Sequence, residues 1–346
     1  KKKKIIVEPL YTADDARETL DHFIGMSYDR PFEVAPGVLC SFREAGHILG
    51  SAITVLTIKD HDDGKVKRLV FTGDLGRRNM PLIRNPYQVE ETEYLLMEST
   101  YGNRLHDSIL EAEDKLAAIV KTTAARGGKI LIPAFSLGRT QEIIYSLHKL
   151  ANEHKIPELP IYVDSPLSVN LTEVFKKNLG VLDEETQKLF LDSKTDPFNF
   201  SQLHYIQSVE ESKALNNHNG PCIIISSPGM CEHGRILHHI KNSIEDHRNT
   251  LVIVGYQAVN TLGRKIVDKM SPVNIFGKPH DVKMEVKIMN AYSAHADRSD
   301  LLDYATKIQG LQKLILVHGE EDAAEDLKTA MLGNGIKEVI VPAFGD

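Results

Sequence analysis

The chain has 346 residues, 42% hydrophobic and 26% charged, a composition typical of a globular protein large enough for two domains. Its 48 acidic and 41 basic side chains give a net charge of −7, which excludes a protein whose whole surface attracts nucleic acid but allows a local basic cleft. Three cysteines without CxxC spacing exclude a cysteine zinc finger, and no apolar run approaches the roughly 20 residues of a membrane span.

The first part of the chain is predicted to form one helix and then a series of strands. Thr12 and the acidic residues after it indicate the start of an amphipathic helix that runs to about Phe23. Residues 1–7 precede this helix without a Met, which we interpret as a chain entered midway. Strands follow over residues 32–34, 38–42, 52–58 and 69–73, and a turn at residues 60–64, in which His61 is expected to be solvated, joins the last two.

The middle of the chain alternates strands with helices. After a strand over residues 94–98 and a helix over residues 108–126, strands are predicted near residues 130–132, 161–163, 222–225 and 251–254, with helices over residues 140–151 and from about 169 and 234. This alternation predicts a parallel sheet covered on both faces. Residues 282–346 resume the pattern of the first part of the chain, in which strands end in loops that carry histidine or acidic residues. We therefore predict an outer domain of residues 1–127 and 281–346 and an inserted domain of residues 128–280.

Four loops each carry a side chain of metal-binding type at or near the end of a predicted strand: His47, Asp74, His295 and His318. Imidazole nitrogen and carboxylate oxygen are ligands that zinc accepts, and a paired zinc site needs several of them. A single loop histidine is more often a surface residue than a ligand, so the prediction depends on the joint setting of the four loops. We expect the loops to meet at one edge of a sheet and to surround metal.

Nine segments in order support a family resemblance: AGHILGS, FTGDLG, LLMESTYG, GGKILIPAFSLGRTQEI, PIYVDSPLS, SSPGMCEHGRILHH, VGYQAVNTLG, YSAHAD and LVHGEE. Over nearly its whole length the chain resembles the metallo-β-lactamase-fold nucleases with a β-CASP insert, which process messenger RNA 3′ ends or degrade RNA. The resemblance implies an α/β fold in which a β-CASP domain is inserted near the end of a metallo-β-lactamase αββα sandwich. It also implies two zinc ions in the cleft between the two domains.

The resemblance further implies roles for individual residues. His47 and His318 would be zinc ligands, Asp74 a bridging ligand, and Glu98 the hydrogen-bond partner of His295. His295 would lie over the scissile phosphate, neutralise its charge and protonate the leaving oxygen. The family's HxHxDH ligand motif, which the family places before the point where this chain starts, is absent from this sequence. We favour omission of an N-terminal segment over a degenerate member, because each retained motif position has the residue that the chemistry requires.

Two strand-to-helix turns of the inserted domain are candidate contacts for RNA phosphates. Ser136 and Arg139 open one helix, and Ser227 and Arg235 precede or open another, a setting that presents backbone N–H groups and arginine to anions. The alternative is helix capping, with Arg139 paired to a nearby acid. Ser293, in the loop of His295, completes the set.

The function predicted from the sequence is that of a zinc-dependent ribonuclease. It would hydrolyse phosphodiester bonds of single-stranded RNA, in RNA processing or decay, by metal-hydroxide attack in the interdomain cleft. One alternative is a non-catalytic RNA-binding or scaffold member without the HxHxDH ligands; another is a small-molecule hydrolase, against which the large insert speaks. The three cysteines indicate a reducing, cytoplasmic setting without membrane association. Endonuclease or exonuclease action and the oligomeric state, a homodimer included, stay open.

Overall fold

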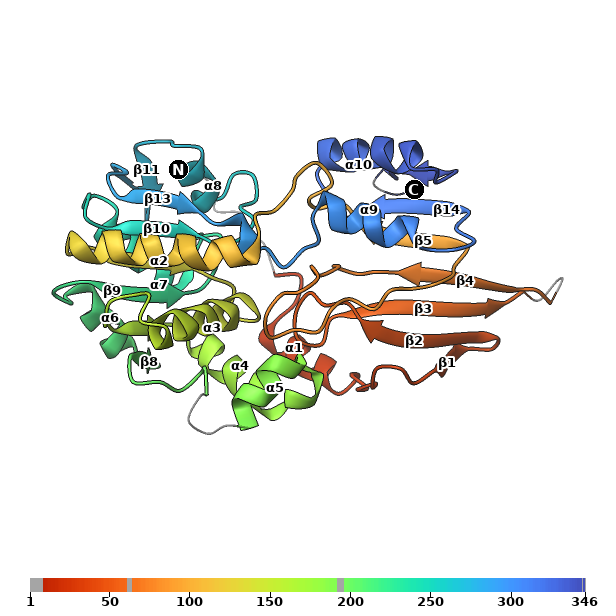
Figure 1. The fold of residues 1–346 in the computed structure, drawn as a ribbon, viewed down its shortest axis with the longest axis horizontal. Coiled ribbons are helices and arrows are strands. Elements are labelled where there is room, and N and C mark those ends of the chain that lie inside the picture. Colours follow the sequence, from red (N-terminus) through yellow and green to blue (C-terminus); the bar gives the residue numbers. More distant parts are fainter. Residues whose placement is uncertain (1–8, 61–63, 192–195, 344, 346) are drawn as a thin grey trace.

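The computed structural model describes residues 9–60, 64–191, 196–343 and 345, which form two α/β lobes that lie side by side (Figure 1). The outer lobe is built on a seven-stranded mixed sheet, and the inserted lobe is built on a six-stranded parallel sheet. This arrangement confirms the predicted α/β class. Among the described residues, no helix combines the length and the apolarity that crossing a membrane requires.

The sheet of the outer lobe changes from antiparallel to parallel pairing across its width. Its order is β1-β2-β3-β4-β5-β14-β15, with antiparallel pairs from β1 to β4 and parallel pairs from β4 to β15. The strands are β1 (Phe32–Ala35), β2 (Val38–Glu44), β3 (Ala52–Lys59), β4 (Val66–Phe71), β5 (Tyr94–Glu98), β14 (Lys313–Val317) and β15 (Val339–Ile340). Because β4, β5 and β14 run in the same direction, their carboxyl ends meet at one edge of the sheet.

Helices α9 (Arg298–Thr306) and α10 (Glu321–Gly333) pack on the sheet of the outer lobe. Leu301 and Leu327 of these helices are buried against Leu95 and Leu316 of the central strands, and this contact forms the apolar core of the lobe. The sandwich implied by the family resemblance has two sheets. The described residues of the outer lobe form one of them.

The inserted lobe has an all-parallel sheet in the order β13-β10-β6-β9-β7-β8. Ile130 and Ile132 of β6 belong to one apolar core and Leu131 to another, so the strand is buried on both faces, as its continuous apolar run predicts. The strands are β6 (Lys129–Pro133), β7 (Ile161–Val163), β8 (Leu203–Tyr205), β9 (Cys222–Ser226), β10 (Thr250–Ile253) and β13 (Glu285–Ile288), and a separate pair is formed by β11 (Val273–Ile275) and β12 (Lys278–His280).

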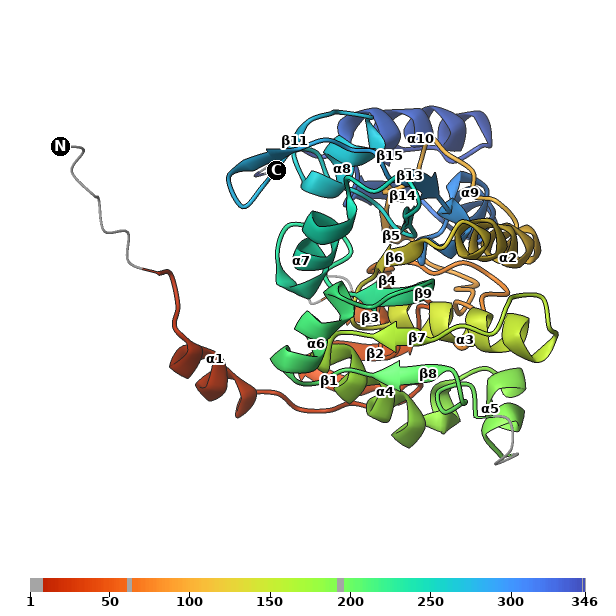
Figure 2. The same ribbon diagram turned by 90° about the vertical axis from the view of Figure 1, so that its left-hand side faces the viewer.

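The helices of the inserted lobe cover this sheet on both sides (Figures 1 and 2). They are α2 (Ile109–Ala125), α3 (Arg139–Asn152), α4 (Pro166–Lys177), α5 (Glu184–Leu191), α6 (Val209–Asn216), α7 (Gly234–Ser243) and α8 (Leu262–Val267), with short 3₁₀ turns at Leu179–Val181 and Asn290–Tyr292. Helix α4 begins three residues before the expected Val169, because Ser165 caps it by accepting a hydrogen bond from the Ser168 N–H and Pro166 occupies the first turn.

The inserted lobe is wider than the residues 128–280 expected for it. Helix α2 packs against β6 and α3, and β13 pairs in parallel with β10, so the sheet and its helices extend from residue 109 to residue 288. The short strand β13 has no local feature that distinguishes a strand of one sheet from a strand of the other. Its assignment is determined by pairing with β10, which is distant in sequence.

Helix α1 (Ala13–Leu20) projects from the body of the molecule, and none of its residues is buried (Figure 2). Thr12 and Asp15 form the expected capping box at its start. The helix ends at Leu20, three residues before the predicted Phe23. Residues 1–7 and His61, about which the sequence made predictions, lie outside the described residues.

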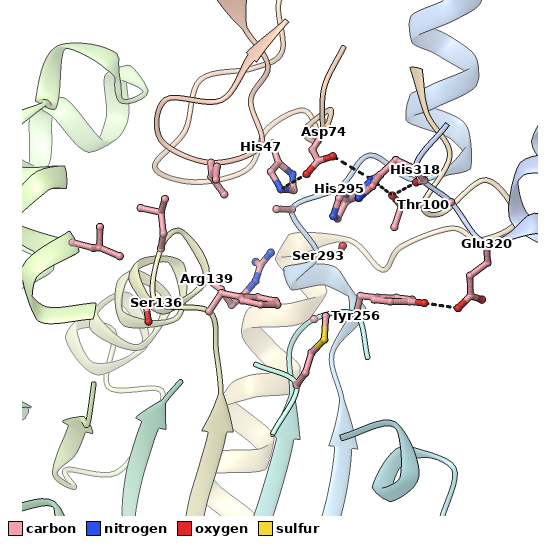
Figure 3. Close-up of a pocket in the computed structure, with 18 of the residues that line it drawn as sticks. His47, Asp74, Thr100, Ser136, Arg139, Tyr256, Ser293, His295, His318 and Glu320 are labelled. Carbon is pink, nitrogen blue, oxygen red and sulfur yellow. Dashed lines mark hydrogen bonds and ion pairs between the residues drawn. The ribbon is translucent and has the colours of Figure 1, made fainter. Parts of the chain in front are cut away.

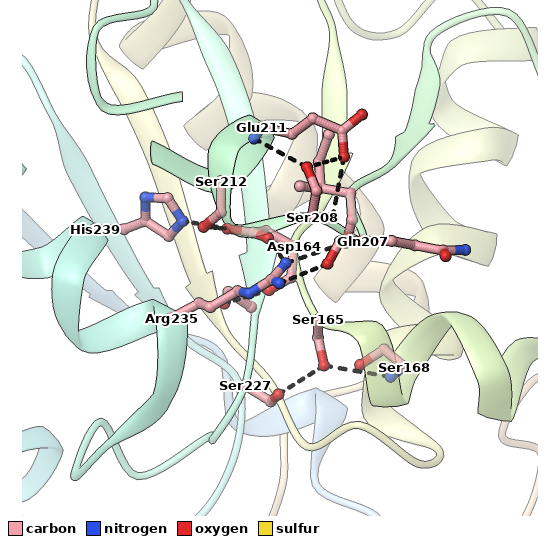
Figure 4. Close-up of polar contacts among 12 residues, drawn as sticks. Asp164, Ser165, Ser168, Gln207, Ser208, Glu211, Ser212, Ser227, Arg235 and His239 are labelled. Carbon is pink, nitrogen blue, oxygen red and sulfur yellow. Dashed lines mark hydrogen bonds and ion pairs between the residues drawn. The ribbon is translucent and has the colours of Figure 1, made fainter. Parts of the chain in front are cut away.

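A buried ion-pair network holds the end of β7 in the inserted lobe (Figure 4). The fully buried Asp164 accepts hydrogen bonds from Arg235 Nη1 and Ser212 Oγ, both at 2.6 Å, and its Oδ2 lies 2.6 Å from His239 Nε2. One carboxylate therefore ties β7 to α6 and α7. Burial alone would raise the pKa of Asp164, but the hydrogen bonds from His239, Ser212 and Arg235 outweigh it and hold this pKa below its ordinary value.

Asp164→Asn is expected to lower the free energy of unfolding at pH 7 by about 3 kcal/mol, because it leaves the Arg235 guanidinium without its buried counter-charge and replaces a carboxylate oxygen that contacts Ser212 and His239. Since the pKa of Asp164 is lower in the folded chain than in the unfolded chain, its stabilising contribution is complete above about pH 4 and is lost as the pH falls through the folded-state pKa. Urea unfolding of both proteins between pH 7 and pH 3 checks this. A difference in stability that is independent of pH would contradict the expectation.

Candidate functional site

A cleft of about 890 Å³ lies between the two lobes (Figure 3). Its wall on the outer lobe carries the side chains that the sequence singled out for metal binding and catalysis, His47, Asp74, His295 and His318. The opposite wall comes from the inserted lobe and includes Phe135, Ser136, Arg139, Leu167, Leu171, Met230 and Tyr256. The four predicted loops therefore do meet in one place.

The parallel strands explain why the predicted residues converge. Asp74 follows β4, Glu98 is the last residue of β5, and His318 is the first residue after β14. These three strands are neighbours in the outer sheet, so their ends present the side chains at the same edge. His47 reaches the same edge from the loop between β2 and β3.

The loops of His47 and Asp74 contact each other through their backbones because two glycines leave the room. The Gly76 N–H donates to the Ala45 carbonyl at 2.8 Å, and a Cβ added at Gly76 would lie only 1.7 Å from the Gly46 carbonyl oxygen. Gly46 has a φ of +67°, and a Cβ there would lie 2.7 Å from the Pro86 nitrogen. Glycine at both positions is therefore required for the approach of the two loops.

The carboxylate of Asp74 lies between two imidazole rings (Figure 3). Its Oδ2 is 3.7 Å from His47 Nε2, and its Oδ1 is 3.2 Å from His318 Nδ1. Two ligand atoms about 2.0–2.2 Å from a tetrahedral zinc ion are roughly 3.3–3.6 Å apart, so these spacings suit metal coordination. In addition, ligand-type atoms of His47, Asp74 and His295 lie within 4.8 Å of one another, as do those of Glu98, His295 and His318. The donor types and their spacing fit a zinc site.

His318 is held in a strained backbone conformation, with a φ of +51°. Thr100 Oγ1 donates to the His318 carbonyl at 3.0 Å and lies 3.3 Å from His318 Nδ1, while Ser99 Oγ donates to the Val317 carbonyl at 2.9 Å. These two hydroxyls, which follow Glu98 directly in sequence, hold the backbone at His318, and that of Thr100 also contacts the ring. Both residues lie in the LLMESTYG segment, but the sequence did not predict their contacts with His318 and Val317.

Glu98 holds His295 as the resemblance implied. The Glu98 carboxylate is 1% exposed, accepts the Leu75 N–H at 2.6 Å and lies 2.9 Å from His295 Nδ1. Burial tends to lower the pKa of His295, but the hydrogen bond and charge of Glu98 and the charge of Asp74 outweigh it, so the pKa lies above its ordinary value. Burial and the neighbouring His295 lower the pKa of His47 to about 4, which leaves the neutral imidazole that binds metals.

The predicted phosphate contacts divide between two cavities. Ser136, Arg139 and Ser293 line the cleft, but Arg139 is 6% exposed and forms an ion pair with Glu142, the arrangement that the capping alternative anticipated. Ser227 and Arg235 line a neighbouring pocket of about 480 Å³. The Arg235 guanidinium is engaged by Asp164 and by the Ile206 and Gln207 carbonyls.

Sequence reasoning missed two further groups at the site. The Tyr101 ring packs against His106, with ring centroids 4.4 Å apart, and lies 6.1 Å from the His295 ring. Across the cleft, the Tyr256 hydroxyl donates to Glu320 and joins the two lobes (Figure 3). Tyr101 and Tyr256 lie within segments that supported the family resemblance, but their partners are distant in sequence and leave no local signal.

Comparison with known proteins gives two family matches. Residues 140–266 match the Beta-Casp domain, and residues 279–342 match the Zn-dependent metallo-hydrolase RNA specificity domain. Together they cover most of the inserted lobe and the part of the outer lobe that carries His295 and His318.

The chain is also similar over almost its whole length to named proteins. It is 34% identical over 343 residues to ribonuclease TTHA0252 of Thermus thermophilus, which covers 99% of this chain and 76% of that protein. It is 32% identical to transcription termination factor FttA of Methanosarcina mazei, covering 93% of this chain and 51% of that protein, and 29% identical to endoribonuclease YSH1 of Eremothecium gossypii, covering 94% and 42%. The chain thus spans three quarters of the Thermus protein but about half or less of the other two.

Gly76→Ala is expected to push the loops of His47 and Asp74 apart and to reduce zinc affinity about tenfold or more, in the range seen when the supports of metal ligands are lost. Zinc retained per chain, measured by mass spectrometry after dialysis against a weak chelator, checks this. Gly333→Ala in α10 is the matched control, because a Cβ there meets nothing within 4 Å. Undiminished zinc retention by Gly76→Ala would contradict the expectation.

Proposed function

The chain belongs to the β-CASP family of metallo-β-lactamase-fold RNA nucleases, and from this premise we propose that the cleft between its lobes is the active site of a zinc-dependent ribonuclease. The family matches, and the similarity to proteins named as ribonucleases, support a metal-dependent hydrolase that acts on RNA. The proposal adds that the substrate is single-stranded and that two zinc ions take part.

One observation carries the proposal: the Asp74 carboxylate lies between the His47 and His318 imidazoles, on the same wall of the cleft as His295. His47, Asp74 and His318 would hold zinc, with one carboxylate oxygen turned toward each imidazole, as suits a bridging ligand. When bound, the metal supplies Lewis-acid activation of water and neutralises charge on the phosphate. The sequence contains no HxHxDH motif, so these three residues would supply part of the coordination.

His295 is the proton donor in this proposal. Its Nδ1 is held by the buried Glu98 carboxylate, which leaves Nε2 as the nitrogen available to a substrate atom. The Glu98 carboxylate is fixed by the Leu75 N–H, and its hydrogen bond and charge raise the pKa of His295 and so favour the imidazolium form. An imidazolium in the cleft would neutralise charge on the scissile phosphate and protonate the leaving oxygen.

The shape of the cleft supports single-stranded rather than duplex RNA. Side chains of both lobes enclose it, with His47 and His318 on one wall and Phe135 on the other, and the Tyr256–Glu320 hydrogen bond joins the walls. Unpaired bases can turn toward the apolar wall while the phosphate faces His295. Paired bases in a duplex are not free to do so.

A second candidate function, RNA binding without cleavage, is favoured by one observation, the absence of HxHxDH from this sequence. Under this alternative the cleft would bind single-stranded RNA with less than one zinc per chain. Measuring zinc content and cleavage on the same preparation separates the two functions.

His295→Ala is expected to reduce cleavage of a fluorescently labelled single-stranded RNA by at least about a hundredfold, because general acid catalysis typically contributes that much or more. Zinc content should stay at the wild-type value, because His295 is assigned to the phosphate and not to the metal. His22→Ala is the control, since His22 is an exposed histidine beyond α1.

Unchanged turnover in His295→Ala would overturn the assignment of the proton donor. Loss of zinc from the same variant would instead make His295 a ligand, in line with its presence in both groups of metal-type atoms. A wild-type chain that binds single-stranded RNA but neither retains zinc nor cleaves would favour the non-catalytic alternative.

A further inference from the structure

Phe135 is a large apolar side chain exposed at the junction of two cavities. It is 45% exposed and lines both the active-site cleft and the neighbouring pocket of about 480 Å³. Leu167, which is 58% exposed at the start of α4, also lines both cavities. The two side chains therefore lie where the cleft and the second pocket adjoin.

The ring of Phe135 is anchored although it is exposed. The backbone carbonyl of Phe135 accepts hydrogen bonds from the Thr140 N–H at 3.2 Å and from Thr140 Oγ1 at 2.8 Å. The first turn of α3 therefore fixes the backbone at Phe135. One edge of the ring packs on Gly229, where an added Cβ would lie 3.2 Å from Cε2 and 3.3 Å from Cδ2. A ring held on one edge and open on the rest is preorganised for a planar ligand.

The cleft wall that carries Phe135 offers few positive charges to the phosphates of an RNA strand. Among the described residues that line the cleft, Arg139 is the single arginine or lysine, and its guanidinium is paired with the buried Glu142. Asp74 and Glu320 add negative charge. The wall opposite the metal-type residues is instead largely apolar, formed by Phe135, Leu167, Leu171 and Met230.

We propose that Phe135, supported by Leu167, is the stacking platform for an unpaired base of the RNA strand next to the scissile phosphate. The inference rests on the proposed function and deepens it by naming the residue that binds a base. Aromatic rings bind successive bases of single strands in this way, and the contact tolerates any base because every base has a π-face. The strand would continue from this base into the second pocket.

Binding of short single-stranded RNAs, followed by fluorescence anisotropy of the full chain, tests the proposal. Phe135→Ala is expected to weaken binding about tenfold, while Phe135→Trp, which keeps a stacking ring, should stay near the wild-type value. The slope of affinity against salt concentration should be unchanged, because stacking releases no counterions. Phe276→Ala is the matched control, since Phe276 is 53% exposed but lies in the β11–β12 turn outside both cavities.

RNAs with an abasic site at successive positions locate the contact. One abasic position should weaken wild-type binding about as much as Phe135→Ala does, and the same RNA should bind Phe135→Ala no more weakly than the intact RNA does. The proposal would be overturned if the losses of affinity caused by the abasic site and by Phe135→Ala add at every position. It would also be overturned if Phe135→Ala binds RNA as tightly as the wild type.

The outcomes for the platform and for the nuclease are separable. If one abasic position and Phe135→Ala are coupled but the wild-type chain does not cleave RNA, the stacking platform is supported and the nuclease is refuted. If cleavage is normal and Phe135→Ala has no effect on binding, the platform alone is refuted. A wild-type chain that binds no single-stranded RNA would overturn both.

Discussion

A single buried carboxylate, that of Glu98, joins the three segments on which the site depends. It ends β5, accepts the Leu75 N–H from the loop of Asp74, and holds His295, which arrives from the end of the inserted lobe. A buried charge is costly unless its hydrogen bonds are complete, so the position of each segment is constrained by the same group. His295 and the loop that carries Asp74 are therefore positioned by one carboxylate.

Two further buried carboxylates, those of Asp164 and Glu142, are paired with cations inside the inserted lobe. Asp164 engages Arg235 and His239, and Glu142 engages Arg139. This pairing stabilises the inserted lobe, but it also occupies the cations that an RNA strand would otherwise meet. It explains why an acidic chain that belongs to a nuclease family presents an apolar wall and few available positive charges in its cleft.

The sequence predicted the strand ends and the metal-type residues well, because each is encoded locally. An apolar run that ends in Gly-Asp or in His-Gly specifies both a strand and the side chain that emerges from it, and the parallel order of β4, β5 and β14 then brings Asp74 and His318 together. The assignment of β13 to the inserted sheet depends on its pairing with β10, a contact that no local pattern fixes. Phe135 has the sequence pattern of an ordinary loop residue, and its ring packs on Gly229, a contact distant in the chain that no local pattern predicts.

The hydrogen bond between Tyr256 and Glu320 has a consequence for how the two lobes move. The bond joins the two walls of the cleft, so the cleft can widen at that point only when the bond is broken. Burial and the neighbouring Glu320 raise the pKa of Tyr256 to about 12. The phenol therefore keeps the proton that it donates throughout the neutral range. Any separation of the two lobes at this point must therefore break that hydrogen bond, because deprotonation of the phenol does not release it at neutral pH.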